Sequence, residues 1–134
     1  MTQEVAMTTQ EQQQWIKEQY QVATKYLAEK GLVTQSVTAE ESRYLTPMIA
    51  IWKLTVTGGS KYWVICGDLP TDHSSIDVAT TARDALKHFS LKWQVQAENL
   101  LQSDNNAQKD FAGFLISRAE GLYQVCDNEN LWQA

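Results

Sequence analysis

The chain has 134 residues and a mass of 15.2 kDa, the size of one ordinary domain. Hydrophobic residues make up 43% and charged residues 20%, a composition that excludes disordered, collagen-like and coiled-coil chains. Sixteen acidic against eleven basic residues leave a net charge of -5, and no segment concentrates the bases. Nucleic-acid binding is therefore not expected. No apolar run approaches the roughly 20 residues of a membrane helix, so we expect no membrane partner.

The amino-terminal segment and the cysteines indicate a compartment. The first fourteen residues contain no basic stretch followed by an apolar one, so a secretory signal is not expected. Cys66 and Cys126 lie sixty residues apart without a CxxC motif, which favours two buried thiols in a reducing environment. We therefore expect a cytoplasmic protein without a cofactor, in which residues 1–9 form a disordered arm.

The first predicted element is a helix. Thr8 and Glu11 have the spacing of a capping box, and Gly31 supplies a stop. Between them, apolar residues recur at three- and four-residue steps, which predicts a helix with one buried side. These residues are Trp15, Ile16, Tyr20, Ala23, Tyr26 and Leu27.

The next segment changes to the pattern of β-strands. Residues 48–56 and 61–66 are rich in β-branched and aromatic side chains, and Gly58-Gly59 between them predicts a two-residue hairpin loop. That loop would place Leu54 opposite Trp63 and Trp52 opposite Ile65. A turn at Thr46-Pro47 would add a third strand, with Glu40 opposite Lys53.

Two further helices are predicted, over residues 75–102 and 107–126, followed by a tail over 128–134. The element order is then α-β-β-β-α-α. We expect a single α+β domain over residues 1–134, a three-stranded antiparallel meander with helices packed on one face.

The predicted pairing leaves apolar side chains without a cover. Ile51, Tyr62 and Val64 would lie on the sheet face away from the helices, and Leu91 and Val95 on the outer side of the second helix. Either a second molecule covers these residues or they form an apolar patch. They are the candidate interface, and a homodimer is one way to cover them.

A polar connection follows the last predicted strand and holds Asp68, Asp72 and His73. These three could ligate a divalent metal, but neighbouring Asp72 and His73 converge on one ion only with a special turn, and no second cluster completes a site. The alternative is that the two aspartates bind backbone amides and cap the next helix. We expect no metal.

Two arginines lie at or inside apolar helical arcs and require anionic or carbonyl partners. Arg83 and Arg118 would either form internal ion pairs, with Glu41, Glu98 or Asp68 as candidates, or line a pocket for a carboxylate or phosphate. Glu41 and Arg43 would share the sheet face of Trp52 and could belong to the same polar cluster.

Three segments resemble a known family. They are residues 63–73 (WVICGDLPTDH), residues 82–94 (ARDALKHFSLKWQ) and residues 41–45 (ESRYL). Together they are similar to a small family of proteobacterial proteins known only as a domain of unknown function, over about residues 14–132. The resemblance implies a bacterial, cytoplasmic protein. It assigns no catalytic or binding residue.

The sequence thus favours a non-enzymatic protein-binding or adaptor module with a protein partner or a second copy of itself. We expect a homodimer that works through the free face of the sheet and a groove beside residues 67–75. An immunity or antitoxin-type protein that masks a partner is a variant of this hypothesis. The rival is a small enzyme or a domain that binds a small anionic ligand. It would use Arg83 or Arg118 with the segment from Asp68 to His73.

Overall fold

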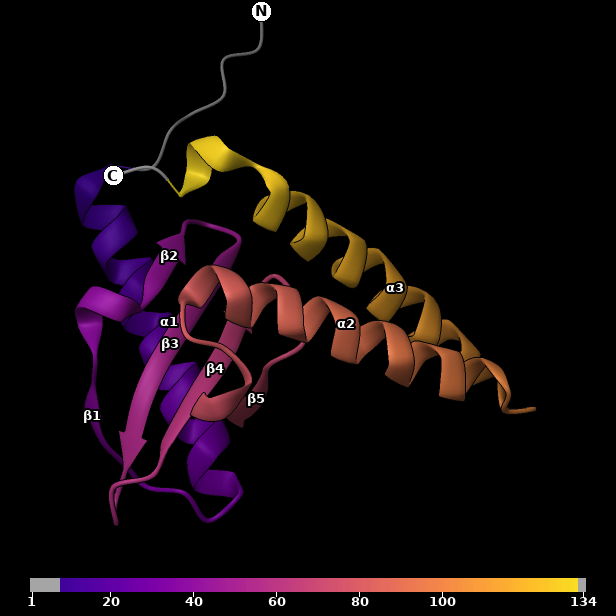
Figure 1. Cartoon of the computed structure of the whole chain (residues 1–134), viewed down its shortest axis with the longest axis horizontal. Coiled ribbons are helices and arrows are strands. Elements are labelled where there is room, and N and C mark those ends of the chain that lie inside the picture. The colour runs from indigo at the N-terminus through magenta and orange to yellow at the C-terminus, as the bar shows by residue number, and fades with distance from the viewer. Residues whose placement is uncertain (1–7, 133–134) are drawn as a thin grey trace, which may run out of the picture. The chain divides into compact units, whose positions relative to one another are not determined.

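The computed structural model describes residues 8–132 and contains the α+β fold expected from the sequence (Figure 1). The chain divides after Ser74 into two compact units. The first unit holds helix α1 and a sheet, and the second holds two long helices. The elements are α1 (Thr9–Glu29), β1 (Thr34–Val37), β2 (Arg43–Leu45), β3 (Ile49–Val56), β4 (Lys61–Gly67), β5 (Asp72–Ser75), α2 (Ala82–Leu101) and α3 (Asn106–Asp127).

Helix α1 begins and ends as its sequence predicts. The Thr8 hydroxyl accepts a hydrogen bond from the Glu11 amide at 3.1 Å, and the Glu11 carboxylate accepts one from the Thr8 amide at 3.3 Å. At the other end Gly31 has a φ of 82°, and the Leu32 amide donates back to the Leu27 carbonyl. The capping box and the glycine stop are both confirmed, although Thr8 and Thr9 belong to the helix start and not to an arm. The rest of the expected arm, residues 1–7, lies outside the described residues.

The sheet is larger than predicted. Its order is β1-β3-β4-β5, and the short β2 pairs with β3 as well, so five strands replace the predicted three. The segment predicted as one strand forms two short strands, β1 and β2, and β5 is a strand that the sequence did not predict. Strand β5 consists of aspartate, histidine and two serines, which are poor strand formers, and it joins the sheet through its neighbour β4.

The predicted hairpin register is wrong by one residue. Trp52 pairs with Val64 and Lys53 with Trp63, where Ile65 and Leu54 were expected to be the partners. The loop contains Thr57 as well as the two glycines, because the Val56 amide donates to the Ser60 carbonyl at 2.9 Å. Both glycines have positive φ, as predicted, but a three-residue loop shifts the pairing and turns every β4 side chain to the other face.

The predicted pairing of Glu40 with Lys53 is also wrong. Strand β1 ends with Val37 opposite Leu54, and residues Ala39–Glu41 leave the sheet as a single 3-10 turn. From that turn the Glu41 carboxylate reaches the Lys53 ammonium at 2.8 Å.

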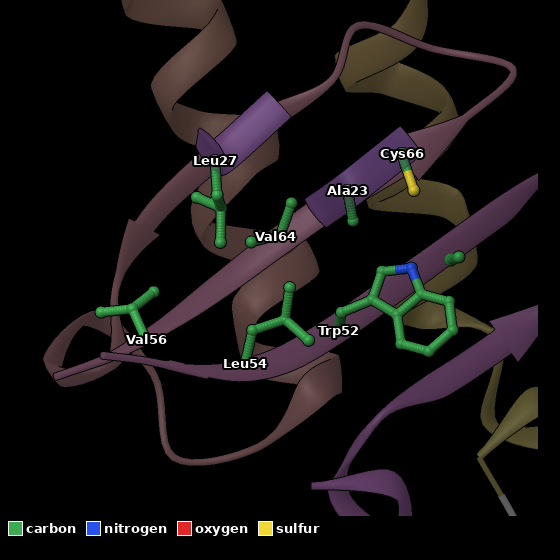
Figure 2. Packing of buried hydrophobic residues seen from close by; sticks show 8 residues of the cluster. Ala23, Leu27, Trp52, Leu54, Val56, Val64 and Cys66 are labelled. Carbon is green, nitrogen blue, oxygen red and sulfur yellow. The ribbon is translucent and has the colours of Figure 1, made fainter. Parts of the chain in front are cut away.

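The core of the first unit lies between α1 and one face of the β3–β4 hairpin. Figure 2 shows Ala23 and Leu27 of α1 directed at the strands that carry Leu54 and Val64. All four are completely buried. Burial of a large aliphatic side chain stabilises a fold by about 1.5–3 kcal/mol, so this layer contributes much of the stability of the unit. The full cluster is Ala23, Leu27, Ala50, Trp52, Leu54, Val56, Val64 and Cys66.

The sequence predicted that Ile51 and Val64 would be uncovered on a free face of the sheet, and this prediction is wrong. Both side chains have 0% exposure. Val64 faces α1 because of the corrected register, and Ile51 shares the opposite face with Trp63 and Ile65, which are equally buried. Tyr62 is partly buried and packs against the core cluster beside α1.

The second unit is a helical hairpin. Helix α2 begins at Ala82 and not at residue 75, because Ser75 caps only a short 3-10 turn and Thr81 caps the helix proper through the Asp84 amide. Asn105 caps α3 through two backbone amides. Between the helices the buried Ser90 hydroxyl donates to the Ala119 carbonyl at 2.7 Å.

The end of α3 continues into a short docked segment. Residues Glu129–Leu131 form a 3-10 turn, and the Trp132 indole donates to the Val125 carbonyl at 3.0 Å. The described part of the predicted tail is therefore folded back on α3. Residues 133 and 134 lie outside the described residues, and the expectation of one single domain stays a prediction.

Candidate functional site

The segment from Asp68 to His73 binds backbone groups close to it. The Asp68 amide donates to the Met48 carbonyl at 2.8 Å, and the Asp72 carboxylate accepts from the His73 amide at 2.8 Å. Asp72 therefore binds a backbone amide, as the sequence suggested, but Thr81 and not an aspartate caps α2. Within residues 8–132 no three histidine, cysteine, aspartate or glutamate side chains come together as a metal site would require.

His73 is part of a polar cluster that the sequence did not predict. Its Nδ1 lies 2.9 Å from the Tyr26 hydroxyl of α1. The His73 ring also contacts the rings of Tyr26 and Tyr62, with centroids 5.4 Å and 5.8 Å apart. The sequence placed Tyr26 on the apolar stripe of α1, and nothing in the spacing indicated the partner of its hydroxyl. We call Tyr26, Tyr62, Asp72 and His73 the tyrosine–histidine cluster.

The electrostatics of this cluster favour a structural role. Burial raises the pKa of Tyr26 to about 12, and the negative charge of Asp72 and a hydrogen bond to it act in the same direction. A phenol with that pKa keeps its proton near neutral pH and is a poor general base. The cluster ties the edge strand β5 to α1.

Arg83 forms an internal ion pair. Its Nε donates to the Cys126 carbonyl at 2.7 Å, and its terminal nitrogens reach both carboxylate oxygens of Glu129 at 2.8 Å and 3.3 Å. The hydrogen bonds from Arg83 lower the pKa of Glu129. The carboxylate partner of Arg83 in the structure is Glu129 and not Glu41, Glu98 or Asp68.

Arg118 lies elsewhere on the hairpin. Its guanidinium sits 4.8 Å from the centre of the Phe114 ring, a cation–π geometry. Arg118 precedes Cys126, the α3 residue that Arg83 binds, by eight positions, which is about 12 Å along a helix. The two arginines therefore do not form one anion site.

The predicted placement of Glu41 and Arg43 on the Trp52 face is wrong, and both residues instead lie toward the β3 face of Ile51 and Lys53. Arg43 pairs directly with Ile51 across the β2–β3 ladder, and directly opposed side chains share a face. The Trp52 face is reached instead by Tyr44, whose ring lies 4.8 Å from that of Trp52. Glu41 binds Lys53, as described above.

The second unit has a groove along its two helices. One stretch has a volume of about 550 Å³ and is lined by Gln94, Glu98, Ile116, Glu120, Tyr123 and Gln124. A second stretch of about 290 Å³ is lined by Arg83, Asp84, Lys87, Tyr123, Cys126, Asp127 and Glu129. Because Tyr123 lines both stretches, they adjoin one another, and we call them together the α2–α3 groove.

Two residues expected at an interface lie beside this groove. Leu91 is 51% exposed and Val95 61% exposed. They are one helical turn apart, and each is three positions before a groove residue, Gln94 and Glu98 respectively, so they border the α2 wall. The sequence identified this outer side of α2. It missed the contribution of Ile116 and Tyr123, because α3 had been described only by its inner side.

Carboxylates dominate the rim of the groove. Glu98 and Glu120 line the larger stretch, which has no basic lining residue. In the smaller stretch Asp84 and Asp127 accompany one lysine, Lys87, while Arg83 and Glu129 neutralise each other. The larger stretch therefore combines Ile116 and Tyr123 with two carboxylates, and the smaller stretch is mostly polar with a small excess of negative charge.

Neither cysteine has the properties of a catalytic thiol, and the described helices do not have those of a membrane span. Cys66 and Cys126 are free and buried, and burial raises the pKa of each thiol to about 11, so neither is an activated nucleophile. None of the helices within residues 8–132 has both the length and the apolar character that a membrane crossing requires.

Comparison with known proteins places the chain in a family. The model of the family described as "Domain of unknown function (DUF4826)" matches residues 9–132. No curated protein and no solved structure matches the chain. The match spans both units, from the start of α1 to the docked Trp132, and the chain therefore belongs to the DUF4826 family.

Proposed function

We propose that this protein is a protein-binding or adaptor module that works through the outer side of the α2–α3 hairpin. The observation that carries the proposal is the exposure of Leu91 and Val95 beside an open groove. Exposed apolar side chains bordering a concavity are typical of surfaces that bind another protein. Tyr123, which is 46% exposed and lines both stretches of the groove, adds an aromatic anchor of the kind enriched in interfaces.

The rival ligand-binding function has less support. Three of the five N–H donors of Arg83 bind the Cys126 carbonyl and Glu129, and the Glu129 carboxylate offsets the charge of the guanidinium, so an anionic ligand would compete with that carboxylate. The cytoplasm remains the proposed compartment, and the free thiols of Cys66 and Cys126 agree with a reducing environment.

The proposal can be tested in living cells with a photo-activated cross-linking residue in place of Val95. We expect a discrete adduct at position 95 and none at position 29, where Glu29 lies exposed on α1. Replacing Leu91 by Gln and repeating the experiment should reduce the adduct about tenfold, because apolar contact is lost without a change of charge. Val33→Gln is the matched control, since Val33 is 62% exposed in the first unit.

The identity of the adduct separates two forms of the proposal. An adduct of twice the chain mass would indicate the homodimer expected from the sequence, and light scattering of the purified protein would then show a dimer. An adduct of another mass identifies a different partner, which includes the case of a masked toxin. Equal labelling at positions 95 and 29 would contradict a binding surface on the hairpin.

A further inference from the structure

The α2–α3 groove has features that restrict which partner can occupy it. Its walls are helices, whose backbone amides and carbonyls are paired internally except at the ends. An extended peptide, which binds by adding a strand to a sheet edge, would find no backbone partners there. A helix laid between two helices needs only side-chain contacts. The groove geometry therefore favours a helical partner segment.

The charges of the groove restrict the partner further. In the larger stretch Glu98 stands on the α2 wall and Glu120 on the α3 wall, with Ile116 and Tyr123 as the apolar lining. An apolar stripe on the partner would fill the space between the helices, and its flanks would meet a carboxylate on each side. Lysine or arginine on those flanks would complement both carboxylates.

A second copy of this chain complements the groove poorly. Self-association through the outer side of the hairpin would bring Glu98 and Glu120 of both copies into one interface, where like charges repel. The net charge of -5 adds to the repulsion at longer range. The negative rim therefore favours a basic partner over a homodimer.

We propose that the α2–α3 groove binds an amphipathic helix whose apolar stripe is flanked by lysine or arginine. This inference rests on the proposed protein-binding function and specifies the partner. The groove residues of α2 run from Arg83 to Glu98, about 22 Å of helix. A partner segment of about fifteen residues matches that length. Gln124 on the α3 wall offers its side-chain amide to the polar edge of the partner, whereas the Gln94 amide nitrogen already donates to the Ser90 hydroxyl at 3.2 Å.

The inference is tested with two synthetic helices in a fluorescence anisotropy titration of the full chain. One peptide of about fifteen residues carries leucines on one side and lysines on the flanks, and its twin carries glutamates in place of the lysines. We expect the lysine peptide to bind at least about tenfold more tightly than the twin. Its advantage should shrink between about 50 mM and about 500 mM salt, because salt screens exposed charges.

Matched variants locate the binding to the groove. Glu98→Gln with Glu120→Gln should weaken the lysine peptide about fivefold, a size expected for two exposed charge pairs. The control, Glu29→Gln with Glu40→Gln, removes the same charge from exposed positions of the first unit and should leave the affinity unchanged. Equal losses in the two double variants would overturn the groove as the binding site.

The outcomes distinguish this inference from the proposed function. If both peptides bind equally and Leu91→Gln weakens both, the hairpin surface stands but the basic partner is wrong. If neither peptide binds and position 95 forms no adduct, both proposals fall. A self-adduct at position 95 together with weak peptide binding would show that a second copy occupies the groove, and this inference would be rejected.

Discussion

The two units of the chain differ in where their exposed apolar side chains lie. In the first unit both faces of the β3–β4 hairpin are buried, and polar groups such as Tyr26 and His73 pair with each other. In the second unit the outer side of the helical hairpin leaves Leu91, Val95 and Tyr123 substantially exposed. The first unit also exposes large apolar side chains, but Val22, Val33 and Met48 lie on separate segments of the chain. Leu91, Val95 and Tyr123 instead line or border one groove. Under the proposed function, the second unit is the one that contacts the partner.

The largest effect on stability is expected from a substitution that leaves a cavity in the core of the first unit. Leu54→Ala removes a completely buried side chain from the layer between α1 and the sheet. We expect a loss of about 3 kcal/mol in the free energy of unfolding, because the transfer free energy and the cavity cost add. Urea unfolding followed by circular dichroism measures it.

The matched control for Leu54→Ala lies in the second unit. Val95→Ala truncates a side chain that is 61% exposed, so its free energy of unfolding should stay within about 0.5 kcal/mol of the parent protein. A large loss for Val95→Ala would mean that this residue is part of the core, and the distinction between the units would be wrong.

A backbone change at Gly67 should have the next largest effect. This glycine ends β4 with a φ of 131°, and an added Cβ would overlap the Met48 carbonyl oxygen. Gly67→Ala should therefore destabilise the protein by about 2 kcal/mol, since a strained φ adds to the overlap. Gly113→Ala in α3 is the control, because a Cβ there meets open space and alanine favours helix. The midpoint temperature of thermal unfolding should fall below that of the parent for Gly67→Ala and rise above it for Gly113→Ala. Equal shifts of the two midpoints would contradict the prediction.

Removing the Tyr26 hydroxyl should have the smallest effect and should depend on pH. Tyr26→Phe loses the hydrogen bond to His73 and should cost about 1 kcal/mol of unfolding free energy at neutral pH. A pKa raised from 10 to about 12 means that the folded state favours the neutral phenol. The contribution of the neutral Tyr26 phenol to the free energy of unfolding is fully present below pH 10 and is lost as the pH rises towards 12. The parent should therefore lose more stability than Tyr26→Phe across that range.

Urea titrations at a series of pH values test the alkaline difference. The parent and Tyr26→Phe differ only at position 26, so the difference between their two curves isolates the contribution of Tyr26. Tyr123→Phe serves as the control, because Tyr123 is exposed in the second unit and its loss should change stability by less than about 0.5 kcal/mol. Parallel alkaline declines for the parent and Tyr26→Phe would contradict the prediction.

Local sequence signals predicted the helices well and the sheet only in outline. The start of α1 was predictable because the Thr8 capping box acts within one turn of the chain. Strand β5 was not, because its aspartate, histidine and serines join the sheet through β4 and not through their own propensity. The hairpin was located correctly by its two glycines, but its register depended on Thr57, which carries no signal of belonging to the loop.

Candidate site residues could be predicted from the sequence only where they lie on a single helix or strand. Leu91 and Val95 share one side of α2, so helical periodicity alone predicted that they face outwards. The partner of Arg83 was missed because Glu129 follows α3 in a segment that was expected to be a tail. The groove was missed for a related reason, since its lining comes from two helices whose relative rotation cannot be derived from either sequence pattern.

The loop of Thr57, Gly58 and Gly59 has a consequence for related chains. Adding or removing one residue in this loop would shift the β3–β4 pairing by one position. Trp63 and Val64 would then each point to the opposite face of the sheet. Two residues more or fewer would restore the original orientation. Members of the family that keep the same inward-facing side chains should thus differ at this position by even numbers, unless a bulge in β3 or β4 compensates.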